Sequence, residues 1–464
     1  MSPSPAYRPA TTHAALGTEF YDPVAAARFP AHIIRHRDQR WAARVGLDTL
    51  TDAEWIAYFG RFEPLPGSFE QPLALRYHGH QFRHYNPELG DGRGFLFAQL
   101  HDAQDGRLLD FGTKGSGQTP WSRSADGRLT LKGGMREVLA STMLEAQGVY
   151  TSKSFSLIET GEALVRHDEP SPTRSAVLVR LSHSHIRIGS FQRFAALDQP
   201  DNVRRLMDHT IRTHMPALWH DDPSTRAAAF LTEVARRVAL LGAQWMAAGF
   251  VHGVLNTDNI NVTGESFDYG PWRFLPHYDA DFTAAYFDEN GLYAYGRQPD
   301  TLLWNLVRLA ECLLPFAGQE ALQAAIETFP PIFRAALDAS VLRRLGLAPV
   351  SPQQDHAFAQ AWWRWMAESK APFEQAFFDT YAKRNPPRTE AFAPVQDLLD
   401  SYAPATDANP GHPYFNQPHA CTLLIDEVEA IWAPIAERDD WGLFHAKLAA
   451  VDLMRTAILA TDQV

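Results

Sequence analysis

The sequence predicts an α+β fold with two lobes, because its hydrophobic pattern changes from strand-like to helical at about residue 200. Before that point the apolar runs are short and bounded by turn residues, and after it apolar residues recur at the helical spacing. We therefore expect an N-terminal accessory segment over 1–70, a mostly antiparallel sheet in an N-lobe over 71–198, a helical C-lobe over 199–350 and a helical C-terminal extension over 351–464.

The accessory segment begins with residues 1–10, which contain no apolar run, so we expect a loosely packed leader there. Farther along, Thr51 and Glu54 have the spacing of a capping box, in which the two residues cap each other's backbone N–H groups at a helix start. An amphipathic helix is therefore predicted from Asp52 onward, ending before the turn-forming stretch 64–67.

The N-lobe is predicted to contain strands around a single helix. Four short apolar runs have the length and composition of strands, at 95–100, 108–111, 154–158 and 176–181. The helix is expected from Met135 to Gln147, with Gly148 in the left-handed position that often follows a helix. We expect this helix to pack on one face of the sheet.

Helical patterns fill the rest of the chain. The clearest runs from Thr225 to Ala248, where an apolar stripe follows the helical period and Gly249 marks the end. Further helices are predicted at 201–218, 299–316, 318–345, 355–384 and 421–459. A polar stretch with two prolines, 402–411, interrupts the extension as a linker would.

The composition restricts the class of partner. Lys and Arg number 42 against 54 Asp and Glu, a net charge of −12, so nucleic acid and anionic membrane are not expected as partners. No apolar stretch is long enough to span a bilayer, and no secretory signal is apparent. Cys312 and Cys421 cannot supply a disulfide framework. We expect a cytoplasmic protein.

The stretch His252–Asn259, followed by Asp268-Tyr269-Gly270, is the most informative part of the sequence. It is similar to the catalytic loop H-R-D-x-x-x-x-N and the metal-binding D-F-G turn of protein kinases. In that comparison Asn259 and Asp268 are ligands for Mg²⁺ or Mn²⁺, while Val254 stands where the base Asp would be. We therefore expect a bilobal protein-kinase-like fold that handles a nucleotide without the usual kinase base.

A glycine-rich segment precedes the first strong strand. The glycines Gly90 and Gly92 would let backbone N–H groups approach phosphate oxygens, and the planar fork of Arg93 suits a terminal phosphate. Taken alone, the segment is more simply explained as a glycine-rich β-turn, because it matches neither a Walker A sequence nor a G-x-G-x-x-G motif.

The remaining charged candidates are a lysine, a glutamate and two arginines. Lys114 ends a strand and Glu137 lies in the next helix, which is the order of the ion pair that positions phosphates in kinases. For an isolated pair, a solvated surface contact would be the simpler explanation. Arg180 and Arg187 flank one strand end, where such residues are more often ion-paired structure, but beside a triphosphate they would hold a leaving pyrophosphate.

Taken together, these motifs closely resemble the selenoprotein O family, including its bacterial YdiU members. The matching segments cover about residues 75–300 in collinear order. They are Gly79-His80-Gln81-Phe82, Leu89-Gly90-Asp91-Gly92-Arg93, Lys114-Gly115-Ser116-Gly117-Gln118-Thr119-Pro120, Ser122-Arg123, Ala125-Asp126-Gly127-Arg128, Arg136-Glu137, Val179-Arg180, Ser184-His185-Ile186-Arg187, His252–Asn259 and Asp268-Tyr269-Gly270-Pro271.

The resemblance implies an enzyme that binds ATP in a flipped orientation and transfers AMP to Ser, Thr or Tyr hydroxyl groups of proteins, itself included, with release of pyrophosphate. It implies catalytic roles for Lys114, for Glu137 as the partner of that lysine, and for Asp258 as proton acceptor. Asn259 and Asp268 would bind the metal. The implied nucleotide contacts are Gly90, Gly92, Arg93, Lys114, Asp126, Gly127, Arg180, Arg187 and Asp268.

Some alternatives stay open at this point. From the residues alone, Asp258 could equally orient Asn259 or hold a second ion. The whole chain could instead be a phosphotransferase or a nucleotide-binding scaffold without turnover. The sequence ends at Val464 without the cysteine or selenocysteine found near the C-terminus of many family members, so we expect no redox switch of that kind.

Overall fold

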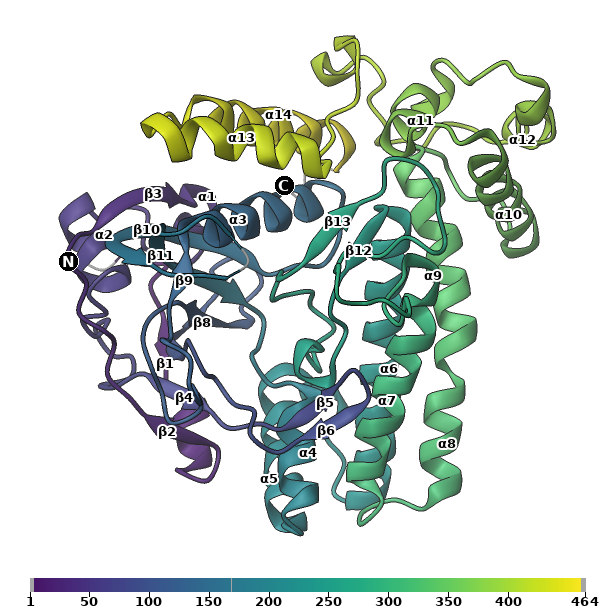
Figure 1. Cartoon of the computed structure of the whole chain (residues 1–464). Coiled ribbons are helices and arrows are strands. Elements are labelled where there is room, and N and C mark those ends of the chain that lie inside the picture. Colours follow the sequence, from purple (N-terminus) through teal and green to yellow (C-terminus); the bar gives the residue numbers. More distant parts are fainter. Residues whose placement is uncertain (1–3, 168, 460–464) are drawn as a thin grey trace.

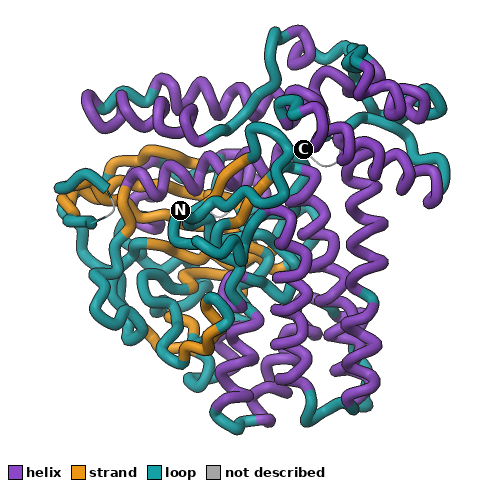
Figure 2. The backbone as a smooth tube through the Cα atoms, turned by 45° about the vertical axis from the view of Figure 1, so that its right-hand side comes forward, coloured by secondary structure: helices purple, strands orange, loops and turns teal. Residues whose placement is uncertain are grey.

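The computed structural model describes residues 4–167 and 169–459 (Figure 1). A sheet-rich lobe lies beside a helical lobe, and the last two helices lie across the sheet-rich lobe. Figure 2 shows the same division, with the strands gathered on one side and the long helices on the other. The expected α+β architecture, with a sheet-rich lobe and a helical lobe, is confirmed.

The main sheet has the order β2-β4-β7-β8-β11-β10-β3, with β1 added beside β7 and β9 beside β11. Among the described residues, all strand pairings in this sheet are antiparallel. The four expected strands are confirmed as β7, β8, β10 and β11. The strands are β1 (Pro9–Ala10), β2 (Tyr21–Pro23), β3 (Ile33–Arg37), β4 (Leu73–Leu75), β7 (Leu96–His101), β8 (Leu108–Lys114), β9 (Leu129–Thr130), β10 (Lys153–Leu164) and β11 (Thr173–Ser182).

The N-terminal segment is part of this sheet. Pro9 lies opposite Leu100, so the expectation of a loose leader is wrong for residues 4–10, while residues 1–3 lie outside the described residues. Strands β2 and β3 pair with β4 and β10. Short strands of this kind carry little sequence signal because their partners supply most of the stability.

Two helices of the N-terminal segment, α1 (Gln39–Arg44) and α2 (Asp52–Phe59), cover one face of the sheet. The capping box of Thr51 and Glu54 is present as predicted. Trp55 of α2 stacks on Phe155 of β10 with a ring-centroid distance of 5.0 Å. This aromatic packing fixes α2 on the sheet.

Helix α3 (Leu131–Ala146) packs on the opposite face. Neighbouring residues of β11 alternate between the two faces, since Leu178 packs in the core with α3 while Val177 and Val179 pack in the core with α2. The helix starts four residues earlier than predicted because the Thr130 side chain caps Gly133. It ends as predicted before Gly148, whose φ is 75°.

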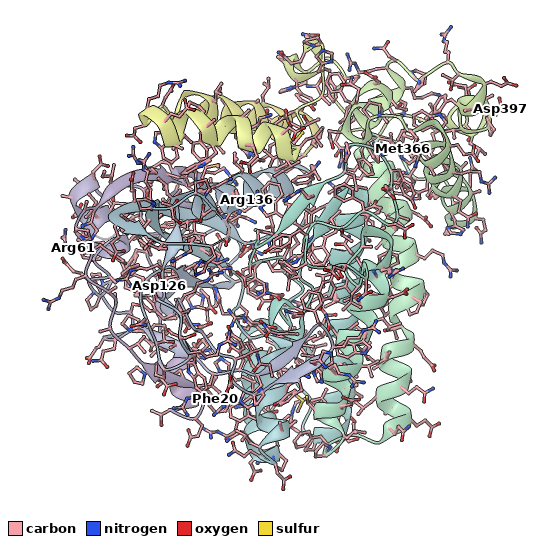
Figure 3. The ribbon with its side chains drawn as sticks, in the orientation of Figure 1. Phe20, Arg61, Asp126, Arg136, Met366 and Asp397 are labelled. Carbon is pink, nitrogen blue, oxygen red and sulfur yellow. The ribbon has the colours of Figure 1, made fainter. Side chains whose placement is uncertain are left out.

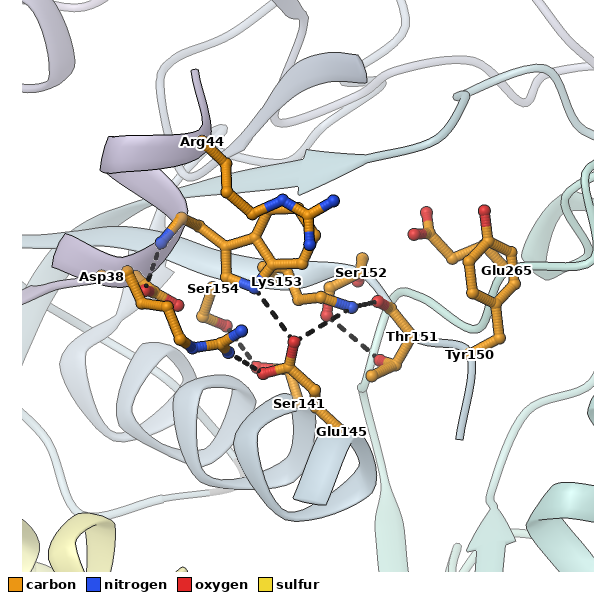
Figure 4. Close-up of polar contacts among 12 residues, drawn as sticks. Asp38, Arg44, Ser141, Glu145, Tyr150, Thr151, Ser152, Lys153, Ser154 and Glu265 are labelled. Atoms are coloured by element: carbon orange, nitrogen blue, oxygen red, sulfur yellow. Dashed lines mark hydrogen bonds and ion pairs between the residues drawn. The ribbon is translucent and has the colours of Figure 1, made fainter. Parts of the chain in front are cut away.

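A polar cluster fastens the C-terminal end of α3 to α1 and β10 (Figure 4). The Glu145 carboxylate accepts a hydrogen bond from the Trp41 indole at 3.0 Å, pairs with Arg40, and lies 3.6 Å from Lys153 Nζ. Burial opposes ionisation of Glu145, but Lys153 and Arg40 outweigh it and lower the pKa of that carboxyl. The cluster therefore keeps Glu145, Arg40 and Lys153 charged although they are largely buried between α1, α3 and β10.

The helical lobe contains α4 (Ile188–Ala196), α5 (Pro200–His214), α6 (Pro223–Ala247), α7 (Gln298–Leu313), α8 (Gln319–Glu327) and α9 (Phe329–Arg344). Helix α4 was not predicted, and the expected helix over 318–345 is two helices. The break falls where two prolines open α9, because proline is favoured in a first helical turn and disfavoured within a helix.

The extension contains α10 (Pro352–Ser369), α11 (Phe373–Thr380), α12 (Ala393–Leu399), α13 (Ile425–Arg438) and α14 (Gly442–Ile458). Helix α14 packs against α3 on the side away from the sheet (Figure 1). Two small strand pairs complete the fold: β5 (Gly79–Gln81) with β6 (His84–Asn86), and β12 (Phe250–His252) with β13 (Trp272–Phe274). Among the described residues, no helix has the length and apolarity needed to cross a bilayer.

Candidate active site

The catalytic-loop motif lies between β12 and β13, at the boundary of the lobes. Buried His252 ties its two parts together, because its Nε2 donates to the Phe267 carbonyl at 3.2 Å while its backbone N–H donates to Gln298 at 2.9 Å. Burial lowers the pKa of His252, which favours the neutral ring in this structural role. The loop and the Asp268 turn are therefore held in one arrangement.

The loop also contacts β5. The Thr257 hydroxyl accepts a hydrogen bond from the His80 backbone N–H at 2.7 Å. A side chain at Gly79 would crowd Thr257 and Asp258. A close approach of backbone to a functional loop is one of the positions that requires glycine. The Gly79-His80 motif thus holds the loop against β5, which packs on α4 of the helical lobe (Figure 1).

The two predicted metal ligands are neighbours. Asn259 Nδ2 donates to Asp268 Oδ2 at 3.1 Å, and Asp268 has a φ of 63°. A left-handed conformation is costly for a residue other than glycine and is found mainly where the surroundings enforce it, often at functional sites. The turn therefore holds the Asp268 carboxylate at the cost of backbone strain.

Lys114 lies at the centre of the ionic network. Its Nζ pairs with Glu137 of α3 and lies 2.8 Å from Asp268 Oδ1. Arg180 Nη1 is 3.2 Å from the same Asp268 oxygen and 4.0 Å from Glu137 Oε2. Lys114 is 4% exposed and Glu137 is 1% exposed, which excludes the alternative of a solvated surface pair. Although burial would raise the pKa of Asp268, Lys114 and Arg180 hold it well below its usual range.

Arg187 is held by a second carboxylate that the sequence did not identify. Its Nη1 lies 2.9 Å from Asp91 Oδ1, and its guanidinium lies over the Tyr77 ring at 4.1 Å. The other Asp91 oxygen accepts the Leu75 backbone N–H at 3.1 Å. Asp91 therefore links the glycine-rich segment to Arg187. Both Arg180 and Arg187 are thus ion-paired within the protein and also face the site.

A cavity of about 340 Å³ brings most of the predicted residues together. Its lining includes five cationic side chains among the described residues, and the sequence analysis gave no role to one of them, Arg123. Four carboxylates also line it, those of Glu88, Asp91, Asp258 and Asp268. The predicted residues that line it are Gly90, Gly92, Arg93, Lys114, Arg180, Arg187, Asp258 and Asp268. So many cations around one cavity suit an anion with several charges.

Asp126 and Gly127 are not brought to this cavity. The exposed Asp126 carboxylate pairs with Arg166 at 2.8 Å (Figure 3). Gly127 has a φ of 68°, and its carbonyl accepts the Gly117 N–H at 3.1 Å, which closes the loop between β8 and β9. In this structure both residues serve the shape of that loop.

Asp258 has the electrostatics of a proton acceptor. Its Oδ1 is buried and has no hydrogen-bond partner among the described residues. Burial raises the pKa of this carboxyl to about 7, with partial compensation from Arg187. A general base is most effective when its pKa is near the working pH. The arrangement is therefore suited to accepting a proton inside the cavity.

The oxygen atoms around Asp268 fit a divalent cation of the Mg²⁺ class. Asn259 Oδ1, like Asp258 Oδ1, is buried without a hydrogen-bond partner among the described residues. Nowhere among the described residues do three His, Cys, Asp or Glu side chains lie close enough together to hold a metal ion by themselves. Magnesium in nucleotide enzymes is commonly held by one or two protein oxygens together with phosphates and water, which matches this donor set.

Comparison with known proteins gives the family. The model of the family described as protein adenylyltransferase SelO matches residues 5–400. The "Protein nucleotidyltransferase YdiU" of Synechocystis sp. is 41% identical over 95% of this chain and 96% of its own length. The protein of the same name from Gloeobacter violaceus is 44% identical over 95% of this chain and 93% of its own length. The protein of that name from Synechococcus elongatus is 52% identical over 73% of this chain and 68% of its own length.

A solved structure, that of ROP2 from Toxoplasma gondii, is described as having a protein-kinase fold and no enzymatic activity. Its similarity covers 75% of this chain and 88% of ROP2, at 12% identity and a TM-score of 0.25, which is too weak for the two sites to be compared. The Synechocystis and Gloeobacter relatives match over more than nine-tenths of both chains and have much higher identity. The chain therefore belongs to the SelO family of protein adenylyltransferases and is an enzyme of the nucleotidyltransferase class.

Proposed function

We propose that the protein transfers AMP from ATP to Ser, Thr or Tyr hydroxyl groups of other proteins, and of itself, with release of pyrophosphate. The observation that carries this proposal is the cavity in which Arg93, Lys114, Arg180 and Arg187 lie beside Asp258 and Asp268. A transferred AMP leaves two phosphates behind, and a cluster of cations stabilises the charge that develops on them.

In the proposed step the acceptor oxygen attacks the α-phosphorus of ATP and forms the new P–O bond. The bond from that phosphorus to the oxygen bridging to the β-phosphorus breaks, and pyrophosphate leaves with the electron pair. Asp258 takes the hydroxyl proton on Oδ1. Arg180 and Arg187 hold the β- and γ-phosphates, and Lys114, positioned by Glu137, neutralises charge near the reacting phosphate.

Asn259 and Asp268 are the residues we assign to Mg²⁺ or Mn²⁺. When bound, the ion would neutralise phosphate charge and orient the triphosphate. Gly90 and Gly92 would allow backbone N–H groups to approach phosphate oxygens. We retain Asp126 and Gly127 as proposed contacts for the nucleotide, although they lie outside the cavity itself. We also retain a cytoplasmic location as part of this proposal.

The position of the isotope identifies the reaction. With ATP labelled in the α-phosphate and Mg²⁺ or Mn²⁺ present, we expect label in protein, and with γ-labelled ATP we expect label only in released pyrophosphate. The products are separated by gel and by thin-layer chromatography. Label from the γ-phosphate in protein would instead identify a phosphotransferase. Tight ATP binding with neither label transferred would identify a scaffold.

Asp258→Asn is expected to lower kcat for α-label transfer by about 10²-fold or more, because it removes the proton acceptor while keeping the size of the side chain. The Kd for ATP, measured by isothermal titration calorimetry, should change by less than about threefold. Asp397→Asn, an exposed position on the far side of the extension (Figure 3), is the matched control. A loss below about tenfold would contradict the base role and favour Asp258 as a residue that orients Asn259.

A further inference from the structure

A second cavity, of about 500 Å³, meets the first one at Arg93 and Lys114, which line both. Of the described residues that line it, seven are cationic and only two are carboxylates, in a chain whose net charge is −12. We call it the basic groove. The cations that it does not share with the first cavity are Arg128, Lys132, Arg136, Arg166 and Arg273.

Three of these five cations already have carboxylate partners. The ion pairs are Arg128 with Glu162 at 2.8 Å, Lys132 with Glu429 at 2.7 Å and Arg166 with Asp126 at 2.8 Å. Their charges are therefore largely compensated within the chain, and they are not the part of the groove that points to an external anion.

Arg136 and Arg273 are different, because neither forms an ion pair within the part of the chain that the structure describes. Arg136, on α3 and next to the catalytic Glu137, lies over the Trp272 ring at 5.0 Å. The Arg273 guanidinium donates to the Trp272 carbonyl at 2.8 Å. Burial and the proximity of Arg273 lower the pKa of Arg136 to about 10, while the Glu429 carboxylate, which pairs with Lys132, opposes this only in part. Two half-buried guanidinium groups of like charge repel each other, so a site that keeps both is suited to an anionic ligand.

An exposed aromatic pair forms another part of the wall. Tyr286 is 85% exposed and Phe287 is 45% exposed, and their rings meet edge to face at 5.2 Å. Both residues line the basic groove. They lie in the segment that leads from β13 to α7, after the Asp268 turn. Exposed aromatic rings beside unpaired arginines are typical of surfaces that recognise another protein.

We propose that the basic groove binds an acidic segment of the acceptor protein, adjacent in sequence to the hydroxyl that receives AMP. Arg136 and Arg273 would pair with its carboxylates, and Tyr286 and Phe287 would pack on its apolar side chains. This inference rests on the proposed function. A segment in the groove would bring its hydroxyl to the junction at Arg93 and Lys114, facing the cavity that contains Asp258.

The test uses fluorescent peptides with one Ser, flanked by Asp and Glu, by Lys and Arg, or by neutral residues. Binding to the full chain without nucleotide is measured by anisotropy, and α-label transfer gives KM and kcat. We expect tighter binding of the acidic peptide. Arg136→Gln and Arg273→Gln should each raise its Kd and KM by about threefold, and the double variant by about tenfold. The kcat and the Kd for ATP should change by less than about twofold.

Charge reversal gives a sharper test. The double variant Arg136→Glu with Arg273→Glu should prefer the basic peptide, because the two new carboxylates would repel the acidic peptide. Arg61→Gln, at an exposed position of the N-terminal segment away from the groove (Figure 3), is the control and should bind all peptides as the wild type does. Thermal midpoints of all variants check that they are folded.

Two outcomes would overturn the inference. One is equal binding of acidic and neutral peptides by the wild type. The other is a rise in the Kd for ATP that equals the rise for the peptide, which would assign the groove to the nucleotide. If no peptide receives label but the acidic peptide still binds and the double variant loses it, the proposed function fails and the docking groove stands.

Discussion

Asp268→Ala is expected to abolish α-label transfer, a fall of roughly 10³-fold or more, because one carboxylate is both the proposed metal ligand and the partner of Lys114, Arg180 and Asn259. Removing it takes away metal-assisted neutralisation of the triphosphate. The measurement is the initial rate of label transfer with Mg²⁺ and with Mn²⁺, together with Mn²⁺ binding in the presence of ATP by electron paramagnetic resonance.

A second readout separates loss of metal from loss of structure. Without Asp268, the cations Lys114 and Arg180 lose an anionic competitor, so the variant should bind metal-free ATP at least as tightly as the wild type does. Asp397→Ala serves as the exposed control. Retention of more than about a tenth of the transfer rate, or weakened binding of metal-free ATP, would contradict the assignment.

Glu145→Ala is expected to lower the free energy of unfolding by about 3 kcal/mol, toward the low end of what is found when one member of a buried ion pair is removed. The variant removes the ion pair of Lys153 with Glu145, leaving the attraction of Glu265, and removes the acceptor for Trp41 and Arg40. Urea denaturation followed by circular dichroism measures the effect, and hydrogen exchange at the C-terminal end of α3 should increase.

The compensating variant distinguishes an unpaired charge from lost packing. Glu145→Leu combined with Lys153→Met removes both charges and keeps apolar volume, so it should recover most of the lost free energy of unfolding. Lys153→Met alone is the matched single change. If the double variant is as unstable as Glu145→Ala, the cost comes from the lost hydrogen bonds to α1 and not from a buried charge.

The fold was predictable where its signals are local. The capping box at Thr51 and the glycine after α3 act over a few residues, and both appear as expected. The strands β1, β2 and β3 were missed because their stability comes from partners 50 or more residues away, such as Pro9 opposite Leu100. The same dependence on distant partners hides any short element whose own sequence is polar or proline-rich.

The site was predictable where residue order carries the information. Lys114 followed by Glu137 specifies a strand and a helix that pack together, and the ion pair is there. The pairing of Arg187 with Asp91 joins residues 96 positions apart, and nothing in either segment specifies the partner. Arg123 was part of a matching motif but had no assigned role, since only the folded loop brings it to the cavity wall.

The sharing of one Asp268 oxygen by Lys114 and Arg180 has a thermodynamic consequence. A divalent ion at Asp268 must compete with two resident cations, whereas phosphate groups that engage those cations remove the competition. By linkage, metal and triphosphate then raise each other's affinity by the same factor. The enzyme would thus take up its metal together with its nucleotide, and in the absence of ATP it would hold neither Mg²⁺ nor Mn²⁺ tightly.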